Sequence, residues 1–142
     1  MVQLIVGKKG KGKTKELLDR VNKTIKSANG SVVYLDKNVK HMYELNNKVR
    51  LIDVSTFPLK NPDEFVGFIC GIISQDHDLE EMYLDSFLNI SKLEQMEDGD
   101  IAGTIRQIEA IGKEFAITFT LSVSKDADEL PEDLKDKIIV SL

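Results

Sequence analysis

The sequence predicts an α/β fold of three layers, in which a mostly parallel sheet of five to six strands is flanked by helices. Two observations support this class. Short apolar runs rich in valine, isoleucine and leucine alternate with longer segments whose apolar residues recur at helical spacing. Most of these segments end at glycine, asparagine or proline, which are typical turn residues. Strands that alternate with helices pair in parallel, and the helices then cover both faces of the sheet.

The first part of the chain predicts three strands with helices between them. Val2 to Val6 is predicted to be a strand, and residues 12–28 a helix, since one face of this segment is apolar (Leu17, Leu18, Val21 and Ile25). Ser31 to Leu35 and Val49 to Val54 are the next two strands. A short helix is expected between them, around residues 39–45.

The middle of the chain predicts a helix and a fourth strand. The helix begins at Asn61-Pro62-Asp63, with proline near its first turn, and continues through Ser74. It is apolar on most sides, so we expect it to be well buried, with Cys70 as a small buried side chain. Residues 82–84 form the fourth strand, which ends at Asp85.

The last third predicts two helices and two strands. Regularly spaced isoleucines indicate a helix that closes at Gly112 (Ile101, Ile105, Ile108 and Ile111). Phe115 to Ser122 is the clearest strand of the chain, Pro131 to Lys137 a last short helix, and Ile138 to Val140 a short terminal strand.

Composition is that of an ordinary globular protein. No segment approaches the roughly 18 uninterrupted apolar residues of a membrane helix, and the N-terminal apolar run precedes its lysines, unlike a signal peptide, so we expect a cytoplasmic protein. A single cysteine excludes an intrachain disulfide and a cysteine-rich zinc site.

The net charge is −5, yet the first 26 residues contain eight lysines or arginines and two acidic residues. This pattern suits a compact polyanion better than a broad nucleic-acid surface.

Near the N-terminus, the segment GKKGKGKT matches the phosphate-binding pattern G-x-x-x-x-G-K-[ST] at every fixed position. It follows a predicted strand and opens a predicted helix, as such a loop must. Glycines let the loop wrap with backbone N–H groups pointing inward, and the helix N-terminus adds positive potential. We expect the whole loop to hold a di- or triphosphate (Gly7, Lys8, Lys9, Gly10, Lys11, Gly12, Lys13 and Thr14).

Two residues of this loop are expected to act directly on the ligand. Lys13 reaches the β- and γ-phosphates and stabilises the charge that develops during reaction, and Thr14 offers its hydroxyl oxygen to Mg²⁺. Lys8, Lys9 and Lys11 occupy variable positions of the pattern and need not touch the ligand, so we expect them mainly to raise the local positive potential.

Asp85 is the second candidate for catalysis and for magnesium binding. A carboxylate at the end of a buried strand, as in MYLD, is typical of the aspartate that holds Mg²⁺ through water beside such a loop. Asp53, at the end of VRLID, is its rival, and Asp36 ends another strand at the same edge. Which of the three faces magnesium is left open.

No residue is evident that would activate the attacking water. Many P-loop ATPases place glutamate directly after this aspartate, whereas here the next residue is Ser86. Ser122 and Ser124, at the end of the late strand, are candidates for contacting the γ-phosphate, although a structural role fits them equally well. Hydrolysis is therefore expected to be slow or to need a partner.

The first 22 residues resemble P-loop nucleoside triphosphatases in general. With MYLDSF in the middle, FTLS late and DELPEDLK near the end, the chain resembles a group of small uncharacterised bacterial P-loop proteins, often labelled ATP-binding or twitching-motility ATPase-like. This resemblance implies a single P-loop nucleotide-binding domain over residues 1–142, and it assigns nucleotide and magnesium binding to Gly12, Lys13, Thr14 and Asp85. The chain has no room for the additional domain of true pilus-retraction ATPases, and it lacks the zinc-binding cysteines of thymidine kinases.

Two other nucleotide-binding classes fit less well. A GTPase should contain [NT]KxD, but the candidate Asn47-Lys48-Val49-Arg50 ends in arginine. Nucleotide kinases usually clamp phosphates with several lid arginines, whereas only Arg20, Arg50 and Arg106 are present. ATP is thus favoured over GTP by default.

Three functions follow in order of preference. The first is a Mg²⁺- and ATP-binding protein that hydrolyses the γ-phosphate slowly and whose nucleotide state a protein partner reads. The second is a non-hydrolytic regulatory module, which the missing glutamate favours. The third is a small phosphotransferase, similar to a nucleoside kinase. Phe57, Phe65 and Phe68 are candidates to line its acceptor pocket, although core packing explains them better.

Overall fold

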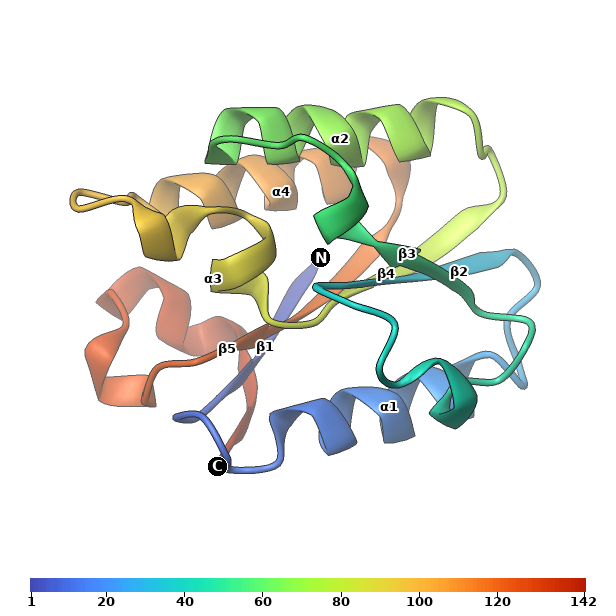
Figure 1. Ribbon diagram of the computed structural model, residues 1–142, viewed down its shortest axis with the longest axis horizontal. Coiled ribbons are helices and arrows are strands. Elements are labelled where there is room, and N and C mark those ends of the chain that lie inside the picture. Colours follow the sequence, from blue (N-terminus) through green and yellow to red (C-terminus); the bar gives the residue numbers. More distant parts are fainter.

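The computed structural model describes residues 1–142 and confirms the α/β class. Six parallel strands form one sheet in the order β3-β2-β4-β5-β1-β6. The strands are β1 (Val2–Val6), β2 (Ser31–Asp36), β3 (Arg50–Asp53), β4 (Leu79–Leu84), β5 (Thr118–Val123) and β6 (Ile138–Ser141). The α-helices are α1 (Lys13–Thr24), α2 (Pro62–Ser74), α3 (Phe87–Ile90) and α4 (Ile101–Phe115). Figure 1 shows α1 on one side of the sheet and α2, α3 and α4 on the other.

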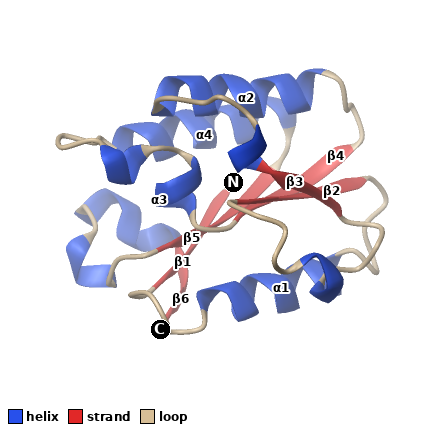
Figure 2. Cartoon of the chain, in the orientation of Figure 1, coloured by secondary structure: helices blue, strands red, loops and turns tan.

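Figure 2 shows helices on both faces of the sheet. Two clusters of buried hydrophobic residues make up the core. The larger cluster has 26 buried residues and includes those of α2, α3 and α4, whereas the smaller one has nine and includes those of α1. Successive residues of β1 alternate between them: Leu4 and Val6 belong to the larger cluster and Ile5 to the smaller. Tyr34 of β2 also belongs to the smaller cluster, so its ring lies on the same side of the sheet as α1.

Most predicted elements are confirmed, with small differences at their ends. β1 has the predicted bounds, whereas α1 ends at Thr24, before the predicted end near residue 28. β4 is three residues longer than predicted, because Leu79 and Glu81 pair with Ser31 and Val32 of β2. Glu80 accepts hydrogen bonds from backbone N–H groups of the turn before β2, and Glu81 accepts one from the Tyr83 hydroxyl.

Gly112 does not end the fourth helix, contrary to the prediction. α4 continues to Phe115, and Ala116 ends it with a φ of 56° in the left-handed region. A Cβ atom on Gly112 would lie 2.8 Å from the backbone oxygen of Ile117, so this glycine permits close packing of the chain after the helix. The following strand accordingly starts at Thr118, three residues later than predicted.

The second helix is buried on one face only, and Cys70 is exposed. The expectation of burial on most sides, with a buried cysteine, is therefore wrong. The buried residues of α2 are spaced by four, three and one positions, which places them on a single face (Phe65, Ile69, Ile72 and Ile73). Cys70 and its glycine neighbour belong to the outer face, over which no other element packs (Figure 1).

The short connecting helices were only partly predicted. Two of them, η1 (Met42–Glu44) and η5 (Glu132–Lys137), are 3₁₀ helices at the places where short helices were expected. α3 and the 3₁₀ helix η3 (Leu93–Gln95), which connect β4 to α4, were not predicted. None of the helices has the combination of length and apolar character needed to cross a membrane.

Parallel pairing brings the carboxyl ends of the strands to one edge of the sheet. The loop after β1, the end of β5 and the end of β4 are neighbours there, because β5 lies between β1 and β4. Leu84 pairs with Leu121, so the residues that follow them, Asp85 and Ser122, lie next to each other. This edge holds the candidate site.

Candidate functional site

The loop between β1 and α1 depends on glycine for its conformation. Gly10 and Gly12 have φ angles of 83° and 96°, which side chains other than glycine rarely adopt. No atom lies within 4 Å of where their Cβ atoms would be, so the backbone angle and not crowding requires glycine. Gly12 is also the N-cap of α1 and provides no side-chain hydrogen bond to it. The first N–H groups of α1 therefore have no side-chain cap, which suits a bound anion.

Lys13 is buried without a carboxylate partner. Its side chain is 8% exposed, and its Nζ donates a hydrogen bond to the backbone oxygen of Lys8 at 3.0 Å. The seven salt bridges of the protein do not include it. Burial lowers the pKa of Lys13, the nearby Asp85 opposes this shift, and Lys9 adds to it. A buried cation paired only with a carbonyl oxygen would be stabilised by an anion bound in the loop.

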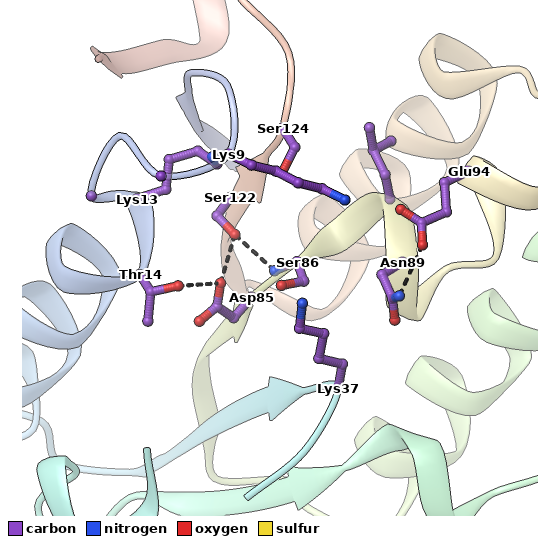
Figure 3. Close-up of a pocket in the computed structure, with 13 residues that line it drawn as sticks. Lys9, Lys13, Thr14, Lys37, Asp85, Ser86, Asn89, Glu94, Ser122 and Ser124 are labelled. Atoms are coloured by element: carbon purple, nitrogen blue, oxygen red, sulfur yellow. Dashed lines mark hydrogen bonds between the residues drawn. The ribbon is translucent and has the colours of Figure 1, made fainter. Parts of the chain in front are cut away.

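Asp85 is the centre of a hydrogen-bonded cluster at the carboxyl edge. It is 2% exposed. Its Oδ1 accepts hydrogen bonds from the Thr14 hydroxyl at 3.3 Å and the Ser122 hydroxyl at 2.8 Å, as Figure 3 shows. Its Oδ2 accepts one from the Tyr34 hydroxyl at 2.7 Å. The Ser122 oxygen in turn accepts a hydrogen bond from the backbone N–H of Ser86 at 2.8 Å, so β2, β4, β5 and α1 are joined at one carboxylate.

The three candidate carboxylates differ in their surroundings. Asp36 is 3% exposed and lines a polar pocket of about 330 Å³ together with Thr14 and Asp85. Burial, with a smaller effect of the Asp85 charge, raises the pKa of Asp36 to about 6, although its hydrogen bond from the Lys37 N–H opposes the shift. Asp53 instead accepts hydrogen bonds from the backbone N–H and hydroxyl of Ser55. It thus holds a turn at the end of the edge strand β3 and lines neither of the pockets beside Thr14.

A larger pocket of about 380 Å³ opens beside the loop and is lined by 13 residues, of which one is hydrophobic. The loop contributes five of them (Lys9, Gly10, Gly12, Lys13 and Thr14). Ser122 and Ser124 come from β5 and its end, and Lys37 follows β2. The remainder come from the segment after β4 (Asp85, Ser86, Leu88, Asn89 and Glu94). The volume falls in the range of small-molecule sites.

The three lysines at variable positions of the loop lie in different places. Lys9 lines the larger pocket. Lys8 points away toward Asp126 and Glu129, with Nζ 3.8 and 3.6 Å from their carboxylate oxygens. Lys11 is exposed and lines neither pocket. Of the three, Lys9 alone is therefore placed to contact a ligand in the larger pocket.

Sequence reasoning missed five residues of the site: Tyr34, Lys37, Leu88, Asn89 and Glu94. The sequence indicates only a core residue at Tyr34. The contact of its hydroxyl with Asp85 depends on β2 and β4 being neighbours. Asn89 and Glu94 lie on α3 and η3, whose sequence has no clear periodicity. Only the tertiary arrangement brings them to the pocket.

Comparison with known proteins gives no family assignment. No protein-family model matches the chain, and a search of curated proteins found no significant match. The chemistry of the site is therefore inferred from its own residues.

Proposed function

We propose that the chain is a P-loop nucleotide-binding protein that takes up a nucleoside triphosphate with Mg²⁺, ATP before GTP, and hydrolyses its γ-phosphate slowly. The proposal rests on one contact above all. The hydroxyl of Thr14 donates a hydrogen bond to Asp85, which is 71 positions further along the chain. From the sequence, Thr14 is expected to bind Mg²⁺, and Asp85 is one of three candidate carboxylates with Asp36 and Asp53. In the fold, Asp85 is the one that contacts Thr14.

The donors around this contact fit magnesium. A hydroxyl oxygen and a carboxylate oxygen are hard ligands of the kind that Mg²⁺ prefers. The residues do not form a full protein cage, since no group of three or more histidine, cysteine, aspartate or glutamate side chains is positioned for a metal. Magnesium commonly binds in this way, through one or two protein ligands, waters and the substrate's phosphates. When bound, the ion would neutralise charge on the phosphates.

The chain's own residues would supply the remaining interactions. Backbone N–H groups of the loop and the start of α1 would hold the β-phosphate, and Lys13 would exchange its hydrogen bond to the Lys8 oxygen for one to a phosphate oxygen. The ammonium would then lie where negative charge develops as the γ-phosphate leaves. Ser124 lines the same pocket and would donate to the γ-phosphate, whereas the hydroxyl of Ser122 already donates to Asp85.

Thermal unfolding with and without nucleotide tests this proposal. Ligand at 100 times its Kd stabilises a protein by about 2.7 kcal/mol, which raises Tm by several degrees at this chain length. We expect this rise for wild-type protein with Mg·ATP, and a loss of it in Lys13→Ala. Lys60→Ala is the matched control, because Lys60 is exposed and lies outside both the loop and the pocket, so its response should equal that of wild type. If wild type responds to neither Mg·ATP nor Mg·GTP, the proposal is wrong.

A small phosphotransferase is the second candidate, and a neighbouring pocket favours it. This pocket of about 370 Å³ shares Lys9, Leu88, Glu94 and Ser124 with the larger one. It adds three apolar residues (Leu93, Met96 and Ile101) and would suit an acceptor with an apolar part. The phenylalanines considered from sequence lie elsewhere: Phe65 is fully buried in the core, and Phe57 and Phe68 pack on each other with ring centres 5.0 Å apart.

The products distinguish the alternatives. Hydrolysis gives inorganic phosphate, whereas transfer gives a phosphorylated acceptor that mass spectrometry detects in a screen of hydroxyl compounds. Wild-type protein that binds nucleotide but forms neither product would be a non-hydrolytic module, the regulatory alternative.

A further inference from the structure

The segment from Asp85 to Gln95 turns back over the larger pocket. Directly after Asp85, Ser86 has a φ of 54°, and Lys92 between α3 and η3 has a φ of 68°. Left-handed backbone at residues other than glycine costs about 1–2 kcal/mol each, so tertiary contacts must hold these turns. At Ser86 the contact is the hydrogen bond from its N–H to the Ser122 hydroxyl. The two turns bring α3 and η3 to the side of the pocket opposite Thr14 and Asp85.

Glu94 is oriented across this pocket. Its Oε1 accepts a hydrogen bond from the Asn89 side-chain amide at 2.8 Å, and Figure 3 shows both side chains on the opposite side of the pocket from Thr14 and Asp85. Its Oε2 makes no hydrogen bond or salt bridge within the protein. One carboxylate oxygen is thus fixed while the other remains free to accept a proton.

The other acidic residues near the pocket are less suitable as a base. Asp85 and Glu94 are the only carboxylates among the 13 lining residues, and no histidine lines the pocket. Both oxygens of Asp85 already accept hydrogen bonds, from Thr14, Ser122 and Tyr34. Asp36 opens to the neighbouring polar pocket instead. Glu94 is therefore the carboxylate of the pocket that is best placed to act as a base.

We propose that Glu94 is the catalytic base of this site and that Asn89 is its positioning residue. The inference rests on the proposed function. Glu94 accepts a proton from the water that attacks the γ-phosphorus. The bond from the water oxygen to phosphorus forms as the bond from phosphorus to the β,γ-bridging oxygen breaks, and the electron pair of the broken bond stays on ADP. The proton then passes from Glu94 to the products, ADP and phosphate.

The charges around the pocket are consistent with this role. Three lysines line it, Lys9, Lys13 and Lys37, and Figure 3 shows the Lys37 ammonium in the space between Ser86 and Asn89. These cations would offset the repulsion between a carboxylate and the triphosphate. Glu94 thus takes the place of the glutamate that many P-loop ATPases have directly after the strand aspartate. Here Ser86 occupies that position, and its left-handed turn sends the chain on to α3.

Glu94→Gln tests the proposal, because it keeps the size and the hydrogen bond from Asn89 but cannot accept the proton. Each variant is assayed for the Tm rise with Mg·ATP and for single-turnover phosphate release. We expect Glu94→Gln to keep the Tm rise and to release phosphate at least about 100-fold more slowly, the usual range for a lost general base. Glu114→Gln is the matched control, since this exposed glutamate lines neither of these pockets, and it should behave as wild type.

Asn89→Ala separates positioning from proton transfer. It should slow phosphate release less than Glu94→Gln and displace the pH profile of the rate, whereas a purely structural role would change Tm and leave the profile in place.

The outcomes are distinct for the two proposals. A wild-type protein without any nucleotide response would contradict the proposed function itself. A normal Tm rise together with phosphate release from Glu94→Gln within about threefold of wild type would overturn the role of Glu94 alone. Nucleotide binding without phosphate release by wild type would overturn it as well.

Discussion

Two segments form most of the larger pocket, and they reach their conformation by different means. The loop from Gly7 to Thr14 places glycine at its positions of positive φ, so its conformation is written in its own residue types. The segment from Asp85 to Gln95 has serine and lysine at its two such positions. Contacts from elsewhere in the fold hold at least the first of these, through Ser122. A sequence pattern can therefore identify the loop, whereas the second segment is recognisable only once its neighbours are known.

Among the substitutions that test this difference between the two segments, Gly12→Val should have the largest effect. A β-branched side chain at a φ of 96° is strained, so we expect the loop to shift and the N–H groups at the start of α1 to lose their arrangement. The Tm rise with Mg·ATP should disappear. Gly71→Ala in the exposed part of α2 is the control, with the nucleotide response intact and a baseline gain of about 0.5–1 kcal/mol. A Gly12→Val protein that still binds nucleotide would contradict the dependence of the loop on glycine.

Asp36 lies outside both segments. The substitution Asp36→Asn measures how much the buried charge of this carboxylate destabilises the protein. Burial raises the pKa of Asp36 from its ordinary 3.8 to about 6, so the folded protein holds this proton more tightly than the unfolded chain. The contribution of Asp36 to wild-type stability should therefore fall as pH rises from 3.8 to about 6 and stay reduced above that. Measured by thermal unfolding without magnesium, Asp36→Asn should raise Tm above pH 6, and this gain should shrink toward pH 3.8. A gain independent of pH would exclude this explanation.

Ser86→Gly should have the smallest effect. It relieves backbone strain at a position of positive φ, whereas Gly12→Val introduces such strain. Glycine removes the cost of the left-handed conformation, while the backbone N–H that bonds Ser122 is kept and no side-chain hydrogen bond of Ser86 is lost. We expect a gain of about 0.5–1 kcal/mol in the free energy of unfolding by urea, reduced in part by the added freedom of the unfolded chain. An unchanged Tm rise with Mg·ATP would be the companion result. Reduced stability would indicate that the serine side chain itself supports the turn.

Much of the fold could be predicted because its signals are local. β1 and the alternation of strands and helices follow from apolar periodicity, and the loop follows from its glycines and lysine. The end of α4 could not be predicted, because Gly112 serves close packing against Ile117 while Ala116 adopts the left-handed cap. The exposure of Cys70 likewise depends on which side of α2 remains uncovered, and a run of apolar residues does not specify this.

The candidate site was predictable in part for the same reason. Thr14 and Asp85 carry local patterns, and the fold brings them into contact. The order of strands, which makes β2 a neighbour of β4, decides that Asp36 lies near this contact while Asp53 lies beyond it on the edge strand. Asn89 and Glu94 depend on the path of the chain after Ser86. No periodicity or turn motif in the sequence encodes that path.

The most direct test of the proposed site is a crystal structure with Mg²⁺ and a non-hydrolysable ATP analogue. We expect the β-phosphate within the loop, the Lys13 ammonium on the β- and γ-phosphates, and Thr14 on the metal, with Asp85 holding the metal through water. Glu94 should face the γ-phosphate from the opposite side, with a water between them. An analogue bound outside the loop, or a metal held by Asp36 or Asp53 without Thr14 and Asp85, would contradict it.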